Sequence, residues 1–315
     1  MAGALSTVII ASVLLLMSQS TLADSPHDQI IERRPTQEQR ESQKNDAAFK
    51  EPTSFPANIR IVRDVPYGSD RQQRFDVYGP MEAKEAPIIF MVHGGAWFLG
   101  DKAGGAVVKN KVAYWAPRGF IFISTNYRLL PKIGPIEQAK DVARALAAAQ
   151  DKAASWGGDR TRFILMGHSA GAHLVALLAT APLISSGIIS TPWLGAISLD
   201  CPALDVVKIM EAKHARFYDR AFGRDPEYWR SASPFHTVAS AGRPILVVCT
   251  TRRDGSCSQA NRFVVKASSL GMRASVLEQN LSHRNVNLLL GKEQRYTEAV
   301  EAFIASLADA VAKWK

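Results

Sequence analysis

Residues 167–171 read Gly-His-Ser-Ala-Gly and match the pattern G-x-S-x-G. An apolar run precedes this pattern at 162–166, and a second apolar run follows it at 170–179. In such a strand–turn–helix context, the motif holds a nucleophilic serine at a sharp turn. The free amides and positive dipole end of the following helix would favour negative charge beside that serine. The pattern therefore predicts Ser169 as the nucleophile of an acyl-transfer reaction.

A second candidate for chemistry is the loop 93–97, which reads His-Gly-Gly-Ala-Trp at the end of a predicted strand. A glycine-rich loop at this place can present backbone N–H groups to an oxyanion, and each such donor is worth roughly 3 kcal/mol in the transition state. We expect the amides of Gly95, Ala96 and Ala170 to form this oxyanion hole. Trp97 follows directly and is a candidate for substrate contact.

The elements that position these residues are read from the apolar patterns. Segments 59–65 and 74–78 alternate apolar and polar residues, as half-exposed antiparallel strands do. Later runs are apolar throughout, as strands buried on both faces are; they lie at 87–92, 120–124, 162–166, 196–199 and 244–249, with a weaker candidate at 276–278. Helical stretches are expected between and after them, at 136–155, 170–179, 258–270 and 292–314. This alternation predicts an α/β fold with a mostly parallel central sheet and helices on both faces.

Beyond the two motifs, further segments are similar to one known family. They are 75–80 (Phe-Asp-Val-Tyr-Gly-Pro), 126–131 (Asn-Tyr-Arg-Leu-Leu-Pro), 157–159 (Gly-Gly-Asp) and 231–234 (Ser-Ala-Ser-Pro). With these, the chain from about Ile59 onward resembles the α/β-hydrolase esterases with an HGGG-type oxyanion loop. It looks closest to the branch of small carboxylesterases, feruloyl esterases and formamidases. Ala96 departs from that pattern by replacing the last glycine, which a backbone donor tolerates if its conformation is permissive.

The resemblance implies a serine hydrolase whose remaining groups follow in the order acid and then histidine. His283 lies in a polar turn after the last predicted strand and is the expected base, taking the proton of Ser169. Asp254 follows the buried run 244–249 and is the expected acid, which would hold the histidine in the correct tautomer. Asp200 and Asp205, after the preceding strand, form the alternative acid site.

The segment 205–236 is rich in aromatic residues and arginines and has no strand pattern, so it is a candidate cap insertion. Loops that follow parallel strands lie at the active-site end of the sheet. We therefore expect Phe217, Tyr218, Phe222 and Trp229 to roof an acyl or aryl pocket, with Phe222 and Trp229 contacting the substrate. The alternative is a cap whose aromatic side chains pack only against each other.

The implied substrate is a small-molecule carboxylic ester, cleaved through an acyl-enzyme without a cofactor. The nearest alternatives are an aryl-formamide amidase and a binding protein that keeps the fold without activity. No HExxH, CxxC or Cys/His cluster occurs, so no metal site is expected. The net charge of +9 is spread along the chain without a nucleic-acid motif, so no nucleic-acid partner is expected. The sequence does not indicate an oligomeric state.

The N-terminal part predicts export. Residues 7–17 are almost wholly apolar, and Thr21-Leu22-Ala23 provides a small-x-small cleavage site. We therefore read 1–23 as a signal peptide, 24–52 as a polar flexible leader and 53–315 as the hydrolase domain, in the periplasm or outside the cell and without stable membrane insertion after cleavage. The alternative is an uncleaved N-terminal anchor.

The chain contains three cysteines. In an oxidising compartment, Cys249 and Cys257 are close enough in sequence to form a disulfide, which leaves Cys201 over. The alternative is three buried, inert thiols.

Overall fold

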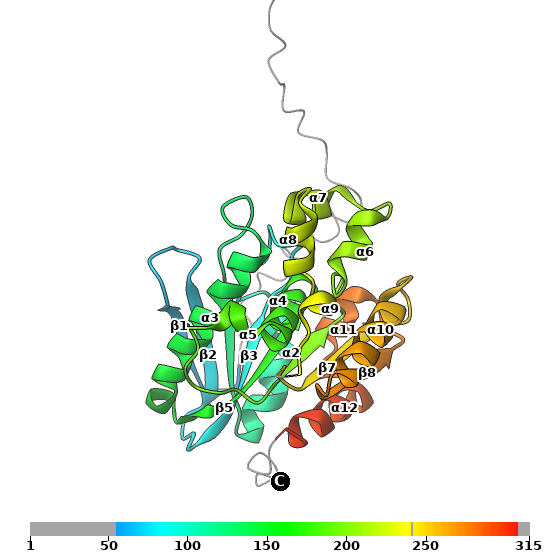
Figure 1. Cartoon of the computed structure of the whole chain (residues 1–315). Coiled ribbons are helices and arrows are strands. Elements are labelled where there is room, and N and C mark those ends of the chain that lie inside the picture. The colour runs from blue at the N-terminus through cyan, green and yellow to red at the C-terminus, as the bar shows by residue number, and fades with distance from the viewer. Residues whose placement is uncertain (1–54, 241, 308–315) are drawn as a thin grey trace, which may run out of the picture. The chain divides into compact units, whose positions relative to one another are not determined.

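The computed structural model describes residues 55–240 and 242–307, and these form a layered α/β structure (Figure 1). The strands are β1 (Ile59–Pro66), β2 (Arg74–Pro80), β3 (Ala86–Val92), β4 (Ile121–Thr125), β5 (Gly158–His168), β6 (Gly195–Leu199), β7 (Ile245–Thr250) and β8 (Ala274–Gln279). Within the described residues they make one eight-stranded sheet in the order β1-β2-β4-β3-β5-β6-β7-β8. β1 and β2 pair antiparallel to their neighbours, and all other pairs are parallel. The predicted fold class is confirmed.

The central strands are apolar throughout because the sheet is covered on both faces. Along β3, Ile88 and Phe90 belong to one buried cluster, whereas Ile89 and Met91 belong to another. Successive side chains of a strand point to opposite faces, so a run without polar residues is what two covered faces require.

The helices divide between these two faces. Helices α3 (Pro135–Lys152), α4 (Ala170–Thr180) and α10 (Ser256–Ser269) contribute to the cluster that contains Phe90. Helices α2 (Gly105–Trp115), α11 (His283–Leu288) and α12 (Gln294–Ala305) contribute to the cluster that contains Met91. The end of the predicted helix 292–314 lies outside the described residues.

The segment between β6 and β7 contains four short helices and no strand. They are α6 (Val206–Glu211), α7 (Arg216–Phe222), α8 (Pro226–Ser231) and α9 (Pro234–Thr237). Figure 1 shows α6, α7 and α8 beyond one end of the sheet, on the side to which β6 delivers the chain. One further short helix, α5 (Pro182–Ser185), follows α4. We call residues 205–237 the cap segment.

The predicted signal peptide (1–23) and leader (24–52) lie outside the described residues. Among the helices that the structure describes, none combines the length and the apolar character needed to cross a membrane.

Candidate active site

Ser169 sits at a sharp turn between β5 and α4. Its backbone has φ 55° and ψ −119°, a conformation that residues with a side chain rarely adopt. A Cβ atom at Gly167 would lie 2.3 Å from the Gly171 carbonyl oxygen, and one at Gly171 would lie 2.2 Å from the Val92 oxygen. Both flanking glycines are therefore required by close backbone approach, and together they project Ser169 from the end of the strand.

A chain of hydrogen bonds connects Ser169 to a buried carboxylate. Nε2 of His283 lies 3.0 Å from Oγ of Ser169, and Nδ1 of the same ring lies 2.5 Å from Oδ2 of Asp200. His283 is the first residue of α11, which Ser282 caps by accepting a hydrogen bond from the Asn285 amide. The His283 side chain is 38% exposed, whereas Asp200 is fully buried. The imidazole can therefore pass a proton between the serine and a reactant, while the carboxylate stays behind it.

The carboxylate beside His283 is Asp200, and the expectation for Asp254 was wrong. Asp200 follows β6, which pairs directly with the strand that carries Ser169. Asp254 follows β7 in a turn and is exposed. Its neighbour Arg253 points toward Asp200 instead. Asp205, the other alternative, caps α6 by accepting the Lys208 amide.

Asp200 is held by one cation, one hydroxyl donor and the imidazole of His283. Its Oδ1 accepts from Nη2 of Arg253 at 2.6 Å and from Oγ of Ser256 at 2.5 Å, which leaves Oδ2 for His283. Burial alone would raise the pKa of Asp200, but the hydrogen bond from His283 and the charge of Arg253 bring it below its ordinary value. The carboxyl group therefore remains ionised.

The predicted oxyanion loop lies beside Ser169. A Cβ atom at Gly94 would lie 2.9 Å from the Ser169 Cβ, so the loop passes close to the nucleophile. Within the described residues, the amides of Gly95 and Ala96 donate no hydrogen bond to another protein group. Ala170 is the first residue of α4, where an amide has no acceptor inside its own helix. These three amides are available to an oxyanion.

The conformation of the loop explains its composition. Gly95 has φ +121°, and a Cβ there would lie 2.1 Å from the Leu99 oxygen, so only glycine fits. Ala96 has φ +49°, in the left-handed region that alanine adopts at a cost of about 1–2 kcal/mol. Alanine in place of the last glycine of an HGGG loop is thus compatible with the backbone that the loop needs.

Comparison with known proteins identifies the same overall fold. The BD-FAE family model matches residues 75–185. The solved structure of esterase B from Lactobacillus rhamnosus superimposes with a TM-score of 0.69 at 19% identity, covering 87% of this chain and 92% of that one. Esterase 2 of Thermogutta terrifontis superimposes with a TM-score of 0.63 at 19% identity, covering 81% and 97%. The chain has the α/β-hydrolase fold.

Curated relatives are similar to this chain over part of their length. Esterase LipC of Mycobacterium tuberculosis is 32% identical over 207 residues, covering 60% of this chain and 50% of that protein. A probable isoprenylcysteine alpha-carbonyl methylesterase of Oryza sativa is 34% identical over 118 residues, covering 37% and 28%. The chain spans half or less of the length of these relatives.

The fold buries two of the three side chains expected to contact substrate. Trp97 is 0% exposed, and its indole N–H donates to Nδ1 of His173 at 3.2 Å. Phe222 is 1% exposed and packs against the Trp97 ring with centroids 5.0 Å apart. Trp229 is partly buried and donates to the Phe222 carbonyl. Trp97 and Phe222 therefore join the oxyanion loop to the cap segment. Trp97 is buried and lines neither of the two pockets described below, which corrects the expectation for it. Phe222 lines the pocket between α3 and the cap segment, and its contact with a substrate stays a prediction.

His168, next to Ser169, contacts His283 in a way that sequence reasoning missed. Its Nε2 donates to the His283 carbonyl oxygen at 2.9 Å, and the two rings lie 4.6 Å apart. Burial, together with the nearby His283, lowers the pKa of His168 to about 3. This ring therefore stays neutral and supports the backbone of His283. The motif places His168 beside Ser169, but no local pattern indicates a contact across 115 residues.

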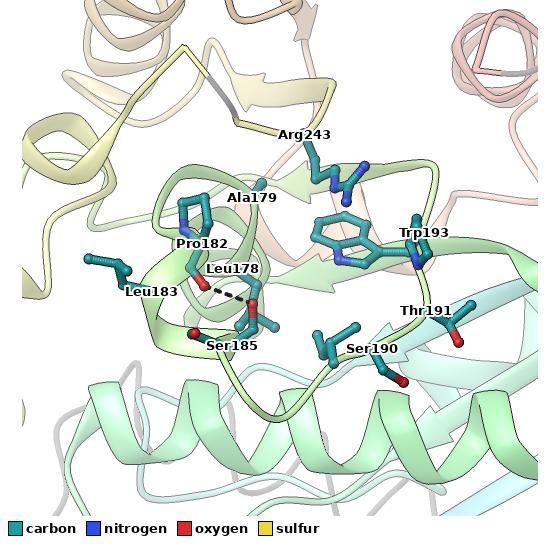
Figure 2. Close-up of a pocket in the computed structure, with 12 residues that line it drawn as sticks. Leu178, Ala179, Pro182, Leu183, Ser185, Ser190, Thr191, Trp193 and Arg243 are labelled. Atoms are coloured by element: carbon teal, nitrogen blue, oxygen red, sulfur yellow. Dashed lines mark hydrogen bonds between the residues drawn. The ribbon is translucent and has the colours of Figure 1, made fainter.

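Two surface pockets lie away from Ser169. Figure 2 shows the first, of about 290 Å³, with Trp193 on one side and Pro182 and Leu183 on the other. Leu178, which also lines this pocket, is near the far end of α4, about 12 Å along the helix from its start at 1.5 Å per residue. The second, of about 520 Å³, lies between α3 and the cap segment. Ser169 lines neither pocket.

The cysteines form one disulfide in the described residues, between Cys249 and Cys257, and Cys201 is free and buried. Glu278 lies close to both sulfur atoms, in the one group of potential metal ligands found among the described residues. Because these sulfurs are bonded to each other, they offer no thiolate to a metal ion.

Proposed function

We propose that this hydrolase cleaves small-molecule carboxylic esters through an acyl-enzyme, with Ser169 as nucleophile, His283 as general base and Asp200 as the carboxylate that orients it. The observation that carries this proposal is the chain of hydrogen bonds from Ser169 through His283 to Asp200, at 3.0 and 2.5 Å. The names of the similar proteins, which include esterases and a probable carboxylic ester hydrolase, support the same reaction class.

The proposed reaction uses each group in turn. His283 takes the proton of Ser169 as Oγ attacks the ester carbonyl, and the amides of Gly95, Ala96 and Ala170 stabilise the negative charge that develops on the carbonyl oxygen. The protonated imidazole then gives its proton to the leaving alcohol, and the acyl group stays on Oγ. A water molecule, activated by the same imidazole, attacks the acyl-enzyme and releases the acid.

A screen with graded substrates tests the proposal. We expect wild-type protein to hydrolyse p-nitrophenyl esters and to be labelled by a fluorophosphonate probe, since both report an activated serine. The panel includes esters of increasing acyl length, a feruloyl ester and N-formylkynurenine. Faster turnover of N-formylkynurenine than of any ester would replace the esterase proposal with an amidase. Absence of both labelling and hydrolysis would leave a binding protein with the hydrolase fold.

We also propose that the protein is exported and cleaved after Ala23. The apolar run 7–17 and the small residues before Asp24 support this. The Cys249–Cys257 disulfide supports it as well, because disulfides persist in oxidising compartments. N-terminal sequencing of the protein from its native host is expected to begin at Asp24. Full-length chain in the membrane fraction would instead support an uncleaved anchor.

A further inference from the structure

The end of β7 carries a short loop whose two ends are covalently joined. Cys249 lies in β7 and Cys257 lies in the first turn of α10, and the disulfide between them encloses the turn. We call residues 249–257 the disulfide loop. Its Thr251 amide also donates to the Gln279 carbonyl oxygen of β8 at 3.0 Å. The loop is therefore fixed at both ends and to the neighbouring strand.

The disulfide loop supplies the polar groups that bind Oδ1 of Asp200, the oxygen that does not face His283. Arg253 donates to Oδ1 at 2.6 Å, Ser256 donates to the same atom at 2.5 Å, and the Thr250 amide lies 3.4 Å from it. Arg253 also donates to Ser256 at 3.2 Å. With Oδ1 occupied by the loop, Oδ2 is the oxygen that faces His283.

We propose that the disulfide loop positions the carboxylate of Asp200 for His283, with Arg253 and Ser256 as its positioning residues. This inference rests on the proposed function, since it concerns how the same relay is oriented. Arg253 acts through Asp200 and not on the substrate. Arg253 lies in the turn after β7, next to Asp254, which the sequence pattern had predicted as the acid.

The positive charge of Arg253 lowers the pKa of Asp200. Asp200 is fully buried, and an unpaired carboxylate in such a place takes up a proton more readily. The charged and titratable groups that act on Asp200 are Arg253 and His283 by direct contact, with His168, Cys201 and Tyr296 further away. Of these, Arg253 is the fixed cation.

The sign of the pH effect follows from these charges. Loss of Arg253 removes a cation that lowers the pKa of Asp200, so the carboxyl group would be protonated at a higher pH. This change moves the acidic limb of the kcat profile toward higher pH.

The test compares two neighbouring arginines. Arg253→Met removes the charge at Asp200, Arg253→Lys keeps it, and Arg252→Met is the matched control because Arg252 contacts the exposed Asn280 side chain. For the best ester in the screen, kcat, KM and Tm are measured from pH 5 to pH 9. We expect Arg253→Met to lower kcat about 10- to 100-fold, as loss of a hydrogen bond to a charged group does, with KM nearly unchanged and the acidic limb at higher pH.

The other variants distinguish a role of Arg253 in positioning Asp200 from a role in folding. Arg253→Lys is expected to recover part of kcat, and Arg252→Met is expected to match wild type. The proposal would be overturned if folded Arg253→Met had a lower Tm but an unchanged kcat and an unchanged acidic limb. Arg253 would then have a structural role only. If wild-type protein neither hydrolyses esters nor reacts with fluorophosphonate, the proposed function fails first, which is a different result.

The contribution of the disulfide is tested by the double variant Cys249→Ser/Cys257→Ser. The loop then has more freedom, so we expect a lower kcat, by about 3- to 10-fold, and a shift of the acidic limb in the same direction as for Arg253→Met. Ser256→Ala, which removes one donor and leaves the loop closed, should give a smaller loss. If the folded double variant keeps the wild-type kcat and pH profile, the disulfide does not help to position Asp200.

Discussion

Ser169→Ala is expected to lower kcat for ester hydrolysis by about 10⁶-fold, the loss seen when the nucleophile of a serine hydrolase is removed. Among the described residues, the hydroxyl that contacts Nε2 of His283 is Ser169 Oγ, at 3.0 Å. The variant should remain folded, because alanine and serine both carry a Cβ and meet the same strain at φ 55°. Loss of activity therefore reports on chemistry and not on stability.

The measurement is the initial rate on the best p-nitrophenyl ester, with intact-mass analysis after fluorophosphonate treatment. Wild type should gain one probe per chain and Ser169→Ala none. Ser231→Ala, an exposed serine at the end of α8, is the control and should behave as wild type. Near-wild-type turnover by folded Ser169→Ala would refute the proposed mechanism.

Asp200→Asn is expected to lower kcat by about 10⁴-fold, as the same change does in the Ser-His-Asp triad of a serine protease. An amide in place of the carboxylate no longer stabilises the imidazolium and can hold His283 in the wrong tautomer. It also leaves Arg253 beside a neutral group, so Tm should fall as well. The kinetic loss must therefore be measured at a temperature where the variant is folded.

Asp254→Asn is the matched control for this prediction. Asp254 is exposed in the turn after β7, so its substitution should leave kcat within about twofold of wild type, as surface changes usually do. Circular dichroism and Tm of both variants show whether each is folded. The reverse ranking, with Asp254→Asn the more damaging, would return the acid to the end of β7 and contradict the geometry described above.

Much of the fold could be predicted from local pattern. Strands such as β3 are apolar at every position because both faces of the sheet are covered, and β1 alternates because it lies at the edge. The sharp turn at Ser169 could equally be predicted, since close backbone approach at Gly167 and Gly171 leaves a strict local pattern around Ser169. His283 could be predicted because it stands alone in a polar turn after the last strand. In each case the structural requirement acts on residues that are close together in the sequence, so it determines which residue types occur there.

Tertiary structure alone decided which carboxylate faces His283. Parallel strands deliver all their following loops to the same edge of the sheet, so Asp200 after β6 and Asp254 after β7 both satisfied the required chain order. The choice depends on side-chain direction in the disulfide loop, where Arg253 turns toward Asp200 while Asp254 stays exposed.

The burial of Trp97 and Phe222 was likewise decided by packing between segments far apart in the chain. The contact of His168 with the backbone of His283 arises in the same way. Such contacts join residues that share no local pattern, because their energy comes from surfaces that meet only when the sheet, the oxyanion loop and the cap segment have assembled.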